Sequence, residues 1–186
     1  WLDEIKSASS SPVPVLSNTE ISSADAAPIR RAALLVGSPR TKKSTSASLG
    51  GYFMEQLNAR GVETETIQVY TSFNSAERTR LTLEKLDQAD LIVLAFPLYV
   101  DSLPAPVIAA LEKIAAHRAS VKASQSLATI ANCGFPEAKH NDTAIAICER
   151  FANETGMAWL GSLALGGGEG LVHGVPLNEM DGRAIP

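Results

Sequence analysis

Short apolar runs alternate along this chain with longer segments in which apolar residues recur every three or four positions. Continuous apolar runs of this kind are typical of strands buried on both faces of a parallel sheet, and the run at 90–96 is the strongest. The segment at 62–70 instead alternates and is rich in β-branched residues, which also favour strands. The pattern predicts five strands, at residues 32–36, 62–70, 90–96, 127–131 and 157–165.

Helical periodicity fills the intervals between these predicted strands. Leu49, Phe53 and Leu57 lie four residues apart on one face of a segment, and Gly61 follows as a helix stop signal. Helices are predicted at residues 44–60, 75–88 and 142–155, and a further one begins near Pro104 or Pro106. Residues 171–186 carry no helical period.

This alternation predicts an α/β domain whose parallel strands are joined by right-handed crossovers. Five such strands fit the doubly wound order 2-1-3-4-5. At 186 residues the chain suits one domain, which we assign to residues 30–186. Residues 1–29 are rich in serine, proline and small residues, and we treat them as an extension, either a linker or an arm that packs on a neighbouring subunit.

Three loops are expected to meet at one edge of this sheet. In the order 2-1-3-4-5, a ligand binds beyond the carboxyl ends of strands one and three. The loops that arrive there are residues 37–46 and 97–103, with residues 132–137 beside them. These are the turns richest in glycine, proline and hydroxyl side chains, so geometry and composition predict the same site.

The first of these loops has the composition of a phosphate site. Gly37-Ser38-Pro39-Arg40 is followed by Thr41-Lys42-Lys43 and by Ser44-Thr45-Ser46, where the first helix begins. Free N–H groups at a helix N-terminus, hydroxyl donors and the helix dipole favour a dianionic phosphate, and Arg40 adds a planar fork of donors. The alternative is an ordinary turn in which Ser44 or Thr45 only caps the helix.

Composition and charge narrow the classes of function and of site that this chain can have. The net charge of −4 gives no basic footprint for nucleic acid, and no apolar run approaches the roughly 20 residues of a membrane span. Cys133 and Cys148 lie far apart and match no metal spacing, so reduced thiols in a cytoplasmic protein are the simplest interpretation. The three histidines are scattered and indicate neither a metal site nor a catalytic triad.

With these motifs in this order, the chain resembles the NAD(P)H-dependent FMN reductase family of flavodoxin-like flavoproteins, whose fold is a three-layer α/β sandwich. Residues 37–46 resemble that family's FMN phosphate loop, and Pro97-Leu98-Tyr99 resembles its second flavin loop. Residues 132–135 occupy the position of the third loop. The resemblance covers residues 31–177.

The resemblance implies three groups of cofactor-binding residues. Those expected to hold the FMN phosphate are Ser38, Arg40, Ser44, Thr45 and Ser46. Those expected along the edge of the isoalloxazine ring are Pro97, Leu98, Tyr99 and Val100. Those expected on its pyrimidine side are Asn132, Cys133, Gly134 and Phe135. Tyr99 either stacks on the flavin or packs against its own loop, and Cys133 is either redox-active or a small packing residue.

The resemblance further implies an oxidoreductase that transfers a hydride from NAD(P)H through bound FMN to a quinone, a flavin or a similar small acceptor. In such a protein the flavin carries the chemistry, so we name no catalytic side chain and no metal ligand. Members of the family are commonly dimers or tetramers, which implies a homodimer or homotetramer. The alternatives are a flavodoxin-like electron carrier and a non-enzymatic domain that has lost its flavin.

Two features depart from the pattern of that family. Its members usually continue into a last helix over one face of the sheet, whereas residues 171–186 show none, so either the chain is truncated or disordered beyond this point, or a partner subunit covers that face. Related iron–sulfur flavoproteins carry a compact cysteine cluster that this chain lacks, so an iron–sulfur centre is set aside.

The glycine run at 166–170 is interpreted as a flexible turn or as a close approach to the flavin.

Overall fold

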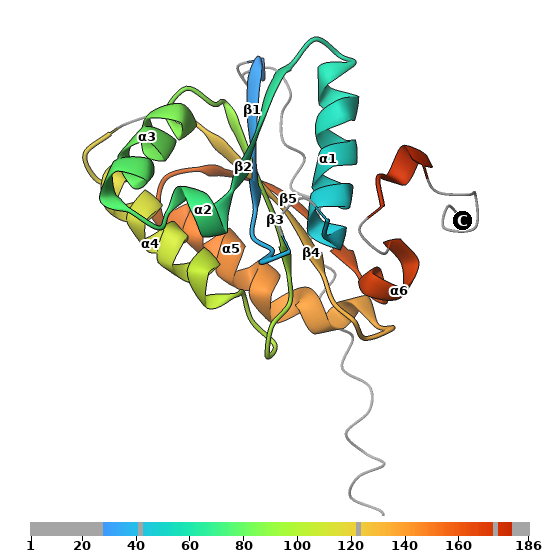
Figure 1. The fold of residues 1–186 in the computed structure, drawn as a ribbon. Helices are drawn as coiled ribbons and strands as arrows, with labels where there is room; N and C mark the ends of the chain where they lie inside the picture. Colours follow the sequence, from blue (N-terminus) through green and yellow to red (C-terminus); the bar gives the residue numbers. More distant parts are fainter. Residues whose placement is uncertain (1–27, 41–42, 122–123, 173–174, 180–186) are drawn as a thin grey trace, which may run out of the picture.

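The computed structural model describes residues 28–40, 43–121, 124–172 and 175–179, so most of the predicted extension at 1–29 lies outside the described residues. Five parallel strands form one sheet in the order β2-β1-β3-β4-β5 (Figure 1). The strands are β1 (Arg31–Val36), β2 (Glu63–Gln68), β3 (Leu91–Pro97), β4 (Ser126–Asn132) and β5 (Ala158–Leu165). The predicted strand order is therefore confirmed, and the strongly apolar β3 lies at the centre of the sheet.

Helices cover both faces of this sheet and give the molecule three layers (Figure 1). On one face lies α1 (Thr45–Asn58), and on the other lie α3 (Ala76–Leu86), α4 (Ala105–Arg118) and α5 (Asp142–Glu154). These helices confirm the predicted ones to within two residues at each predicted end. Shorter helical turns are α2 (Val69–Ser72), η2 (Ala138–Asn141), α6 (Gly168–Val172) and η3 (Leu177–Glu179).

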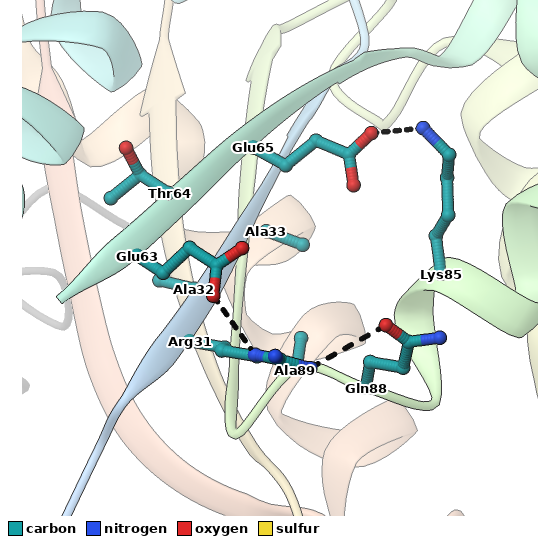
Figure 2. A pocket seen from close by; sticks show the side chains of 9 residues that line it. All are labelled: Arg31, Ala32, Ala33, Glu63, Thr64, Glu65, Lys85, Gln88 and Ala89. Atoms are coloured by element: carbon teal, nitrogen blue, oxygen red, sulfur yellow. Dashed lines mark hydrogen bonds and ion pairs between the residues drawn. The ribbon is translucent and has the colours of Figure 1, made fainter.

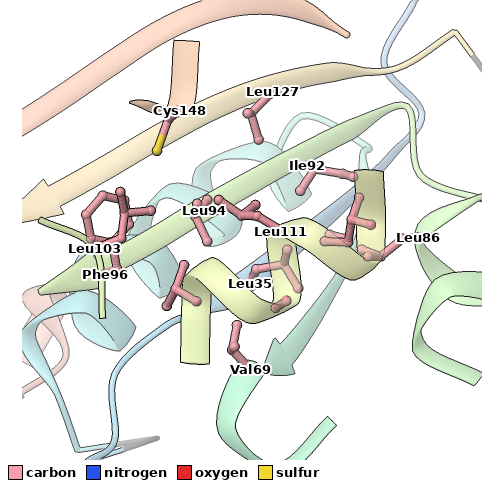
Figure 3. Close-up of a cluster of buried hydrophobic side chains, with 14 of the residues drawn as sticks. Leu35, Val69, Leu86, Ile92, Leu94, Phe96, Leu103, Leu111, Leu127 and Cys148 are labelled. Carbon is pink, nitrogen blue, oxygen red and sulfur yellow. The ribbon is translucent and has the colours of Figure 1, made fainter. Parts of the chain in front are cut away.

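Two hydrophobic cores lie on the two faces of the sheet. The larger one fills the space between the sheet and α3, α4 and α5, and Figure 3 shows Leu35, Leu94 and Phe96 within it. The second lies under α1 and includes Leu34 and Val93 from the same two strands. Because successive side chains of a strand point to opposite faces, β1 and β3 must be apolar at almost every position. This explains the continuous apolar runs in the sequence.

Two short elements differ from the sequence prediction. The pattern extends the second strand to Tyr70, but β2 ends at Gln68 and α2 begins at Val69, whose side chain is buried in the larger core. The segment after β5 was expected to have no helix, yet it contains α6, of which two residues in five are glycine. Burial of Val172 in the second core outweighs the weak helix propensity of glycine at this position.

The strand β5 lies at an edge of the sheet and carries no charged residue. On the α1 face, α6 and η3 pack beside α1 rather than along the whole of β5 (Figure 1). Leu160 and Leu163 of β5 consequently remain exposed. Within the described residues, this strand therefore combines an apolar surface with an unpaired edge.

Both cysteines are buried, free thiols. Cys148 faces the larger core from α5, and burial raises the pKa of its thiol to about 12. Cys148 is thus a core residue. Burial of Cys133 favours its interpretation as a packing residue over a redox-active one.

Candidate functional site

The carboxyl ends of β1 and β3 mark the point at which the connections of the sheet diverge. The loop after β1 leads to α1 on one face, and the loop after β3 leads to α4 on the other (Figure 1). The first loop lies tightly against its neighbours, since Gly37 N–H donates to the carbonyl of Ala95 at 2.7 Å. A Cβ atom at position 37 would lie 2.5 Å from Val107 Cγ2, so only glycine allows this close approach to α4.

Ser44 caps the N-terminus of α1. Its backbone is extended, with φ at −130°, and its Oγ accepts the N–H of Ala47 at 3.1 Å. This cap leaves the N–H groups of Thr45 and Ser46 without a partner inside the helix. The first turn of α1 holds no acidic residue, so the positive end of the helix dipole is not neutralised by a carboxylate there. The helix N-terminus thus has both a cap and the electrostatics of an anion site.

The other hydroxyls of the predicted phosphate group are buried at this end of α1. Ser38 Oγ accepts Arg40 N–H at 3.3 Å, and Ser46 Oγ accepts the side-chain amide of Asn132 at 2.8 Å. Because both oxygens act as acceptors, each hydroxyl still carries a proton that it can donate to an anion. Thr45 differs, since its Oγ1 donates to the carbonyl of Gly168 at 3.4 Å. The Thr45 side chain therefore contacts α6.

The predicted cations of this loop lie at the surface where the structure describes them. Arg40 and Lys43 are exposed, whereas Lys42 lies outside the described residues. Because Arg40 is exposed, its guanidinium can move toward a ligand without any rearrangement of the core. Its planar fork matches two phosphate oxygens.

Asn132 joins the three loops. Its Nδ2 donates to Ser46 Oγ at 2.8 Å and to the carbonyl of Phe96 at 3.0 Å, and its backbone carbonyl accepts Leu98 N–H at 2.7 Å. One residue at the end of β4 thereby fixes the start of α1 and the end of β3, which is Pro97. Since both amide hydrogens are used within the protein, Asn132 positions the loops rather than offering these donors to a ligand.

The second loop presents two exposed side chains. Leu98 packs against the larger core, but Tyr99 is 46% exposed and Val100 is 98% exposed. Tyr99 and Ser102 exchange two backbone hydrogen bonds, of 2.9 and 3.1 Å, which close a two-residue turn between them. Because nearly half of Tyr99 stays exposed, its ring is available for stacking on a ligand.

The third loop turns inward at Cys133 and outward at Phe135. Cys133 N–H donates to the carbonyl of Leu165 at 3.0 Å, and its buried thiol lies 3.5 Å from the carbonyl of Phe135. Gly134 is exposed, and Phe135 is 54% exposed, with its ring centroid 4.5 Å from that of His140. The side chain that this loop offers to a ligand is therefore Phe135 and not Cys133.

Tyr70 is a residue of this edge that sequence reasoning missed. The pattern placed it inside a strand, but it lies in α2, just beyond the carboxyl end of β2. Burial raises the pKa of the Tyr70 phenol, and the nearby phenol of Tyr99 raises it further. The two phenols are therefore near enough for their charges to interact. Only the position of Tyr70 at the end of a predicted strand could have indicated this.

Asn141 is a second residue that sequence reasoning missed. Its side chain is fully buried, and its Nδ2 donates to the carbonyl of Ala138 at 2.9 Å and to that of Leu165 at 3.3 Å. The same nitrogen lies 3.5 Å from Cys133 Sγ. Asn141 thus connects the third loop to the end of β5. An asparagine just before a helix indicates a cap in sequence, but this side chain makes no capping hydrogen bond.

Two hollows elsewhere on the molecule lack the donors and the exposed rings of the three loops. At the amino ends of β1 and β2, a cavity of about 100 Å³ is lined by the ion pairs Arg31–Glu63, at 3.0 Å, and Lys85–Glu65 (Figure 2). It is smaller than ordinary ligand cavities, and its charges neutralise each other. A wider hollow of about 640 Å³ between α3 and α4 is lined by none of the three loops.

Metal and membrane features are absent from the part of the chain that the structure describes. No group of histidine, cysteine and acidic residues there could hold a metal ion. No described helix has the length and apolar character needed to cross a bilayer.

The groups at the carboxyl edge fit an FMN molecule in the chemistry that they offer. A phosphate requires N–H and O–H donors without an opposing acid, which the first turn of α1, Ser38 and Ser46 supply. A flavin ring requires flat apolar contact, which the exposed rings of Tyr99 and Phe135 supply. The two kinds of group lie at the ends of neighbouring strands of one sheet.

These observations define a doubly wound α/β protein with a candidate ligand site at its topological switch point. The family model for the flavodoxin-like fold matches residues 30–169, and the chain belongs to that family. No match is found among curated proteins. The family match confirms the flavodoxin-like sandwich that the sequence predicted.

Several solved structures share this fold at low sequence identity. An NADH:FMN oxidoreductase in its apo form is 19% identical, with a TM-score of 0.62 over 74% of this chain and 76% of that one. An FMN-dependent NADH-azoreductase from Bacillus anthracis in complex with FMN is 12% identical, with a TM-score of 0.55 over 75% and 88% of the two chains. A flavodoxin from Streptococcus pneumoniae is also 12% identical, with a TM-score of 0.54 over 73% and 84%. At sequence identities this low, structural similarity shows a shared fold.

Replacing Asn132 by alanine tests whether its amide holds the loops together. The change removes both donated hydrogen bonds and leaves the buried carbonyl of Phe96 without this donor, so we expect the free energy of unfolding to fall by about 1–3 kcal/mol in urea denaturation. Asn58→Ala is the matched control, because Asn58 makes one longer bond, of 3.4 Å, at the exposed end of α1. Equal losses for the two variants would contradict the role of Asn132.

The titration of Tyr70 tests whether its phenol lies beside that of Tyr99. A negative neighbour raises the pKa of a phenol, so Tyr99→Phe should lower the pKa of Tyr70. That pKa should nevertheless stay above the ordinary value of 10.0, because burial is the larger cause. NMR titration of labelled tyrosine rings measures both quantities, with Tyr52→Phe as the control. If the pKa of Tyr70 is the same in Tyr99→Phe as in the natural chain, the two phenols do not interact.

Proposed function

We propose that this protein is an FMN-dependent oxidoreductase that passes a hydride from NAD(P)H, by way of bound FMN, to a quinone, a flavin or a similar small acceptor. The main support is one juxtaposition at the switch point. The donor-rich N-terminus of α1 lies at the same sheet edge as the exposed rings of Tyr99 and Phe135. A phosphate suits the first of these, a flat ring system suits the second, and FMN contains both.

The residues of the chain have distinct roles in this proposal. Ser38, Ser46 and Arg40, together with N–H groups of the first turn of α1, would hold the phosphate. Tyr99 and Phe135 would contact the ring system, and Asn132 keeps the loops that carry these groups in place. FMN, when bound, supplies the two-electron chemistry. The protein binds and orients the cofactor and leaves apolar surface open for a second ring.

A flavodoxin-like electron carrier is the alternative, because such a protein would use the same edge to bind FMN. Two observations favour the reductase over the carrier. The net charge of −4 over 186 residues is modest, whereas carriers of that class are strongly acidic. The exposed Tyr99 and Val100 give a substrate ring an apolar surface to stack on, which a carrier does not need.

The cellular setting belongs to the same proposal. We place the activity in the cytoplasm, since two buried, free thiols suit a reducing compartment. We also propose a homodimer or homotetramer. Its support is the uncharged edge strand β5, which leaves Leu160 and Leu163 exposed and has no partner strand among the described residues.

An absorbance experiment tests this function directly. Purified protein is incubated with FMN, freed from excess cofactor, and titrated without oxygen with NADPH and separately with NADH. We expect protein-bound flavin absorbance that at least one of the two nucleotides bleaches and that an added quinone restores. Flavin binding without bleaching would favour the carrier. Failure to retain FMN at high concentration would overturn the cofactor assignment.

A comparison of FMN with riboflavin tests the phosphate contact, because the two ligands differ only in that group. Arg40→Ala should weaken FMN binding about 10- to 100-fold, the value of one charged hydrogen bond, and leave riboflavin binding unchanged. Arg60→Ala removes the same charge at the exposed end of α1 and is the matched control. Quenching of flavin fluorescence measures each dissociation constant. Equal weakening of FMN and riboflavin by Arg40→Ala would contradict a phosphate contact.

A further inference from the structure

Val100 has the least favourable backbone conformation at the candidate site for its type of side chain. Its φ is +49°, and the φ of the next residue, Asp101, is +57°. Both values lie in the left-handed region, where the Cβ of an L-residue crowds the following carbonyl oxygen. Aspartate is tolerated there more readily than a β-branched residue, for which this region is a true outlier. The strain therefore lies mainly at Val100.

The turn that contains Val100 is held in place from both sides. Tyr99 and Ser102 exchange backbone hydrogen bonds across it, and Leu98 N–H is fixed by the carbonyl of Asn132 at 2.7 Å. On the far side, Leu103 is buried in the larger core. These anchors impose a two-residue turn with positive φ at both positions, which glycine and asparagine adopt with less strain.

Packing within the protein does not compensate for this strain. Val100 is 98% exposed, so its two methyl groups contact almost nothing in the chain. Residues kept in unfavourable backbone conformations concentrate at ligand sites. Val100 directly follows Tyr99, whose ring is exposed, in the loop after β3. A strained and exposed apolar residue thus lies in a fixed turn, next in sequence to one of the two rings that form the candidate site.

We infer that Val100 is a contact residue for the electron acceptor and that its apolar side chain selects uncharged planar rings, such as quinones. This inference rests on the proposed function and names its substrate class. NAD(P)H carries a charged diphosphate that polar groups can hold, whereas a quinone offers little besides its ring and depends more on apolar contact. The reaction balances when a hydride from NAD(P)H and one proton from water convert the quinone to a hydroquinone.

Two variants separate the strain at position 100 from its apolar character. Val100→Asn relieves the strain and removes both methyl groups, whereas Val100→Thr keeps the β-branch and replaces one methyl group by a hydroxyl. In the protein without cofactor, Val100→Asn should raise Tm by about 2–4 °C, and Val100→Thr should leave it unchanged. An unchanged or lower Tm for Val100→Asn would overturn the strain argument.

Acceptor kinetics then test the contact itself. Both variants should lower kcat/KM for menadione, by about fourfold for Val100→Thr, which corresponds to one lost methyl contact, and by more for Val100→Asn. Val100 is also expected beside the isoalloxazine edge, so each variant is assayed at saturating FMN, and the loss with menadione should exceed any loss with ferricyanide, an anion without a ring, by these factors. Parallel losses with menadione and ferricyanide, or no loss with menadione, would overturn the inference.

A binding measurement without turnover completes the test. In oxidised, FMN-loaded protein with labelled valine methyl groups, adding menadione should shift the Val100 resonances, which are assigned by their loss in Val100→Thr. The exposed methyl groups of Val175 serve as the reference and should not move. If FMN binds and NAD(P)H bleaches it but the Val100 resonances stay in place, the inference about Val100 is wrong and the proposed function stands. If FMN does not bind, the proposed function itself fails.

Discussion

The loops at the carboxyl edge of the sheet depend on the hydrogen bonds that the side-chain amide of Asn132 donates. Loops that follow parallel strands have left the hydrogen-bond ladder, so nothing in the sheet itself fixes their relative positions. The Asn132 side chain joins them instead, because its amide donates to Ser46 Oγ and to the carbonyl of Phe96, and the Asn132 backbone carbonyl accepts Leu98 N–H where the β3–β4 pairing ends. Buried donors and acceptors are costly to leave unpaired, so this arrangement is strongly preferred over any in which one of the loops shifts.

The fold supplies the two kinds of binding chemistry from its two different layers. The hydroxyl and N–H donors come from α1, which lies on one face of the sheet. The exposed ring of Tyr99 comes from the connection to α4 on the opposite face, and the ring of Phe135 comes from the connection to α5 on that same face. A switch point is the place where connections to the two faces separate, so polar and apolar groups can stand next to each other there without sharing a core.

Sequence reasoning predicted the strands, the long helices and the three loops because burial of both faces of the sheet produces continuous apolar runs in the strands, which separate them from the helices and loops. It failed where tertiary contacts decide the outcome. The strand propensity of Val69 and Tyr70 gave no sign that burial of Val69 would start α2. Nor did the glycines of α6 indicate a helix, since its order comes from packing against α1.

The same limit applies to individual side chains of the candidate site. Thr45 and Ser46 are neighbouring hydroxyls in the same motif, yet one donates to the carbonyl of Gly168 and the other accepts from Asn132. The partners lie far away in sequence, so residue type alone cannot distinguish the two roles. For the same reason, Asn141 and Asn132 are found to be buried connectors only once the ends of β4 and β5 are brought together.

The contact between Gly37 and Val107 restricts how this protein can diverge from its relatives. A side chain at position 37 would occupy the space of Val107 Cγ2 and press on Phe96 Cβ at 3.0 Å. Positions 37 and 107 therefore share one volume, although one belongs to the loop after β1 and the other to α4, and neither is assigned a ligand. A lineage that gains an alanine at 37 must lose the valine methyl at 107 in the same step or beforehand. The two positions should therefore covary among homologues.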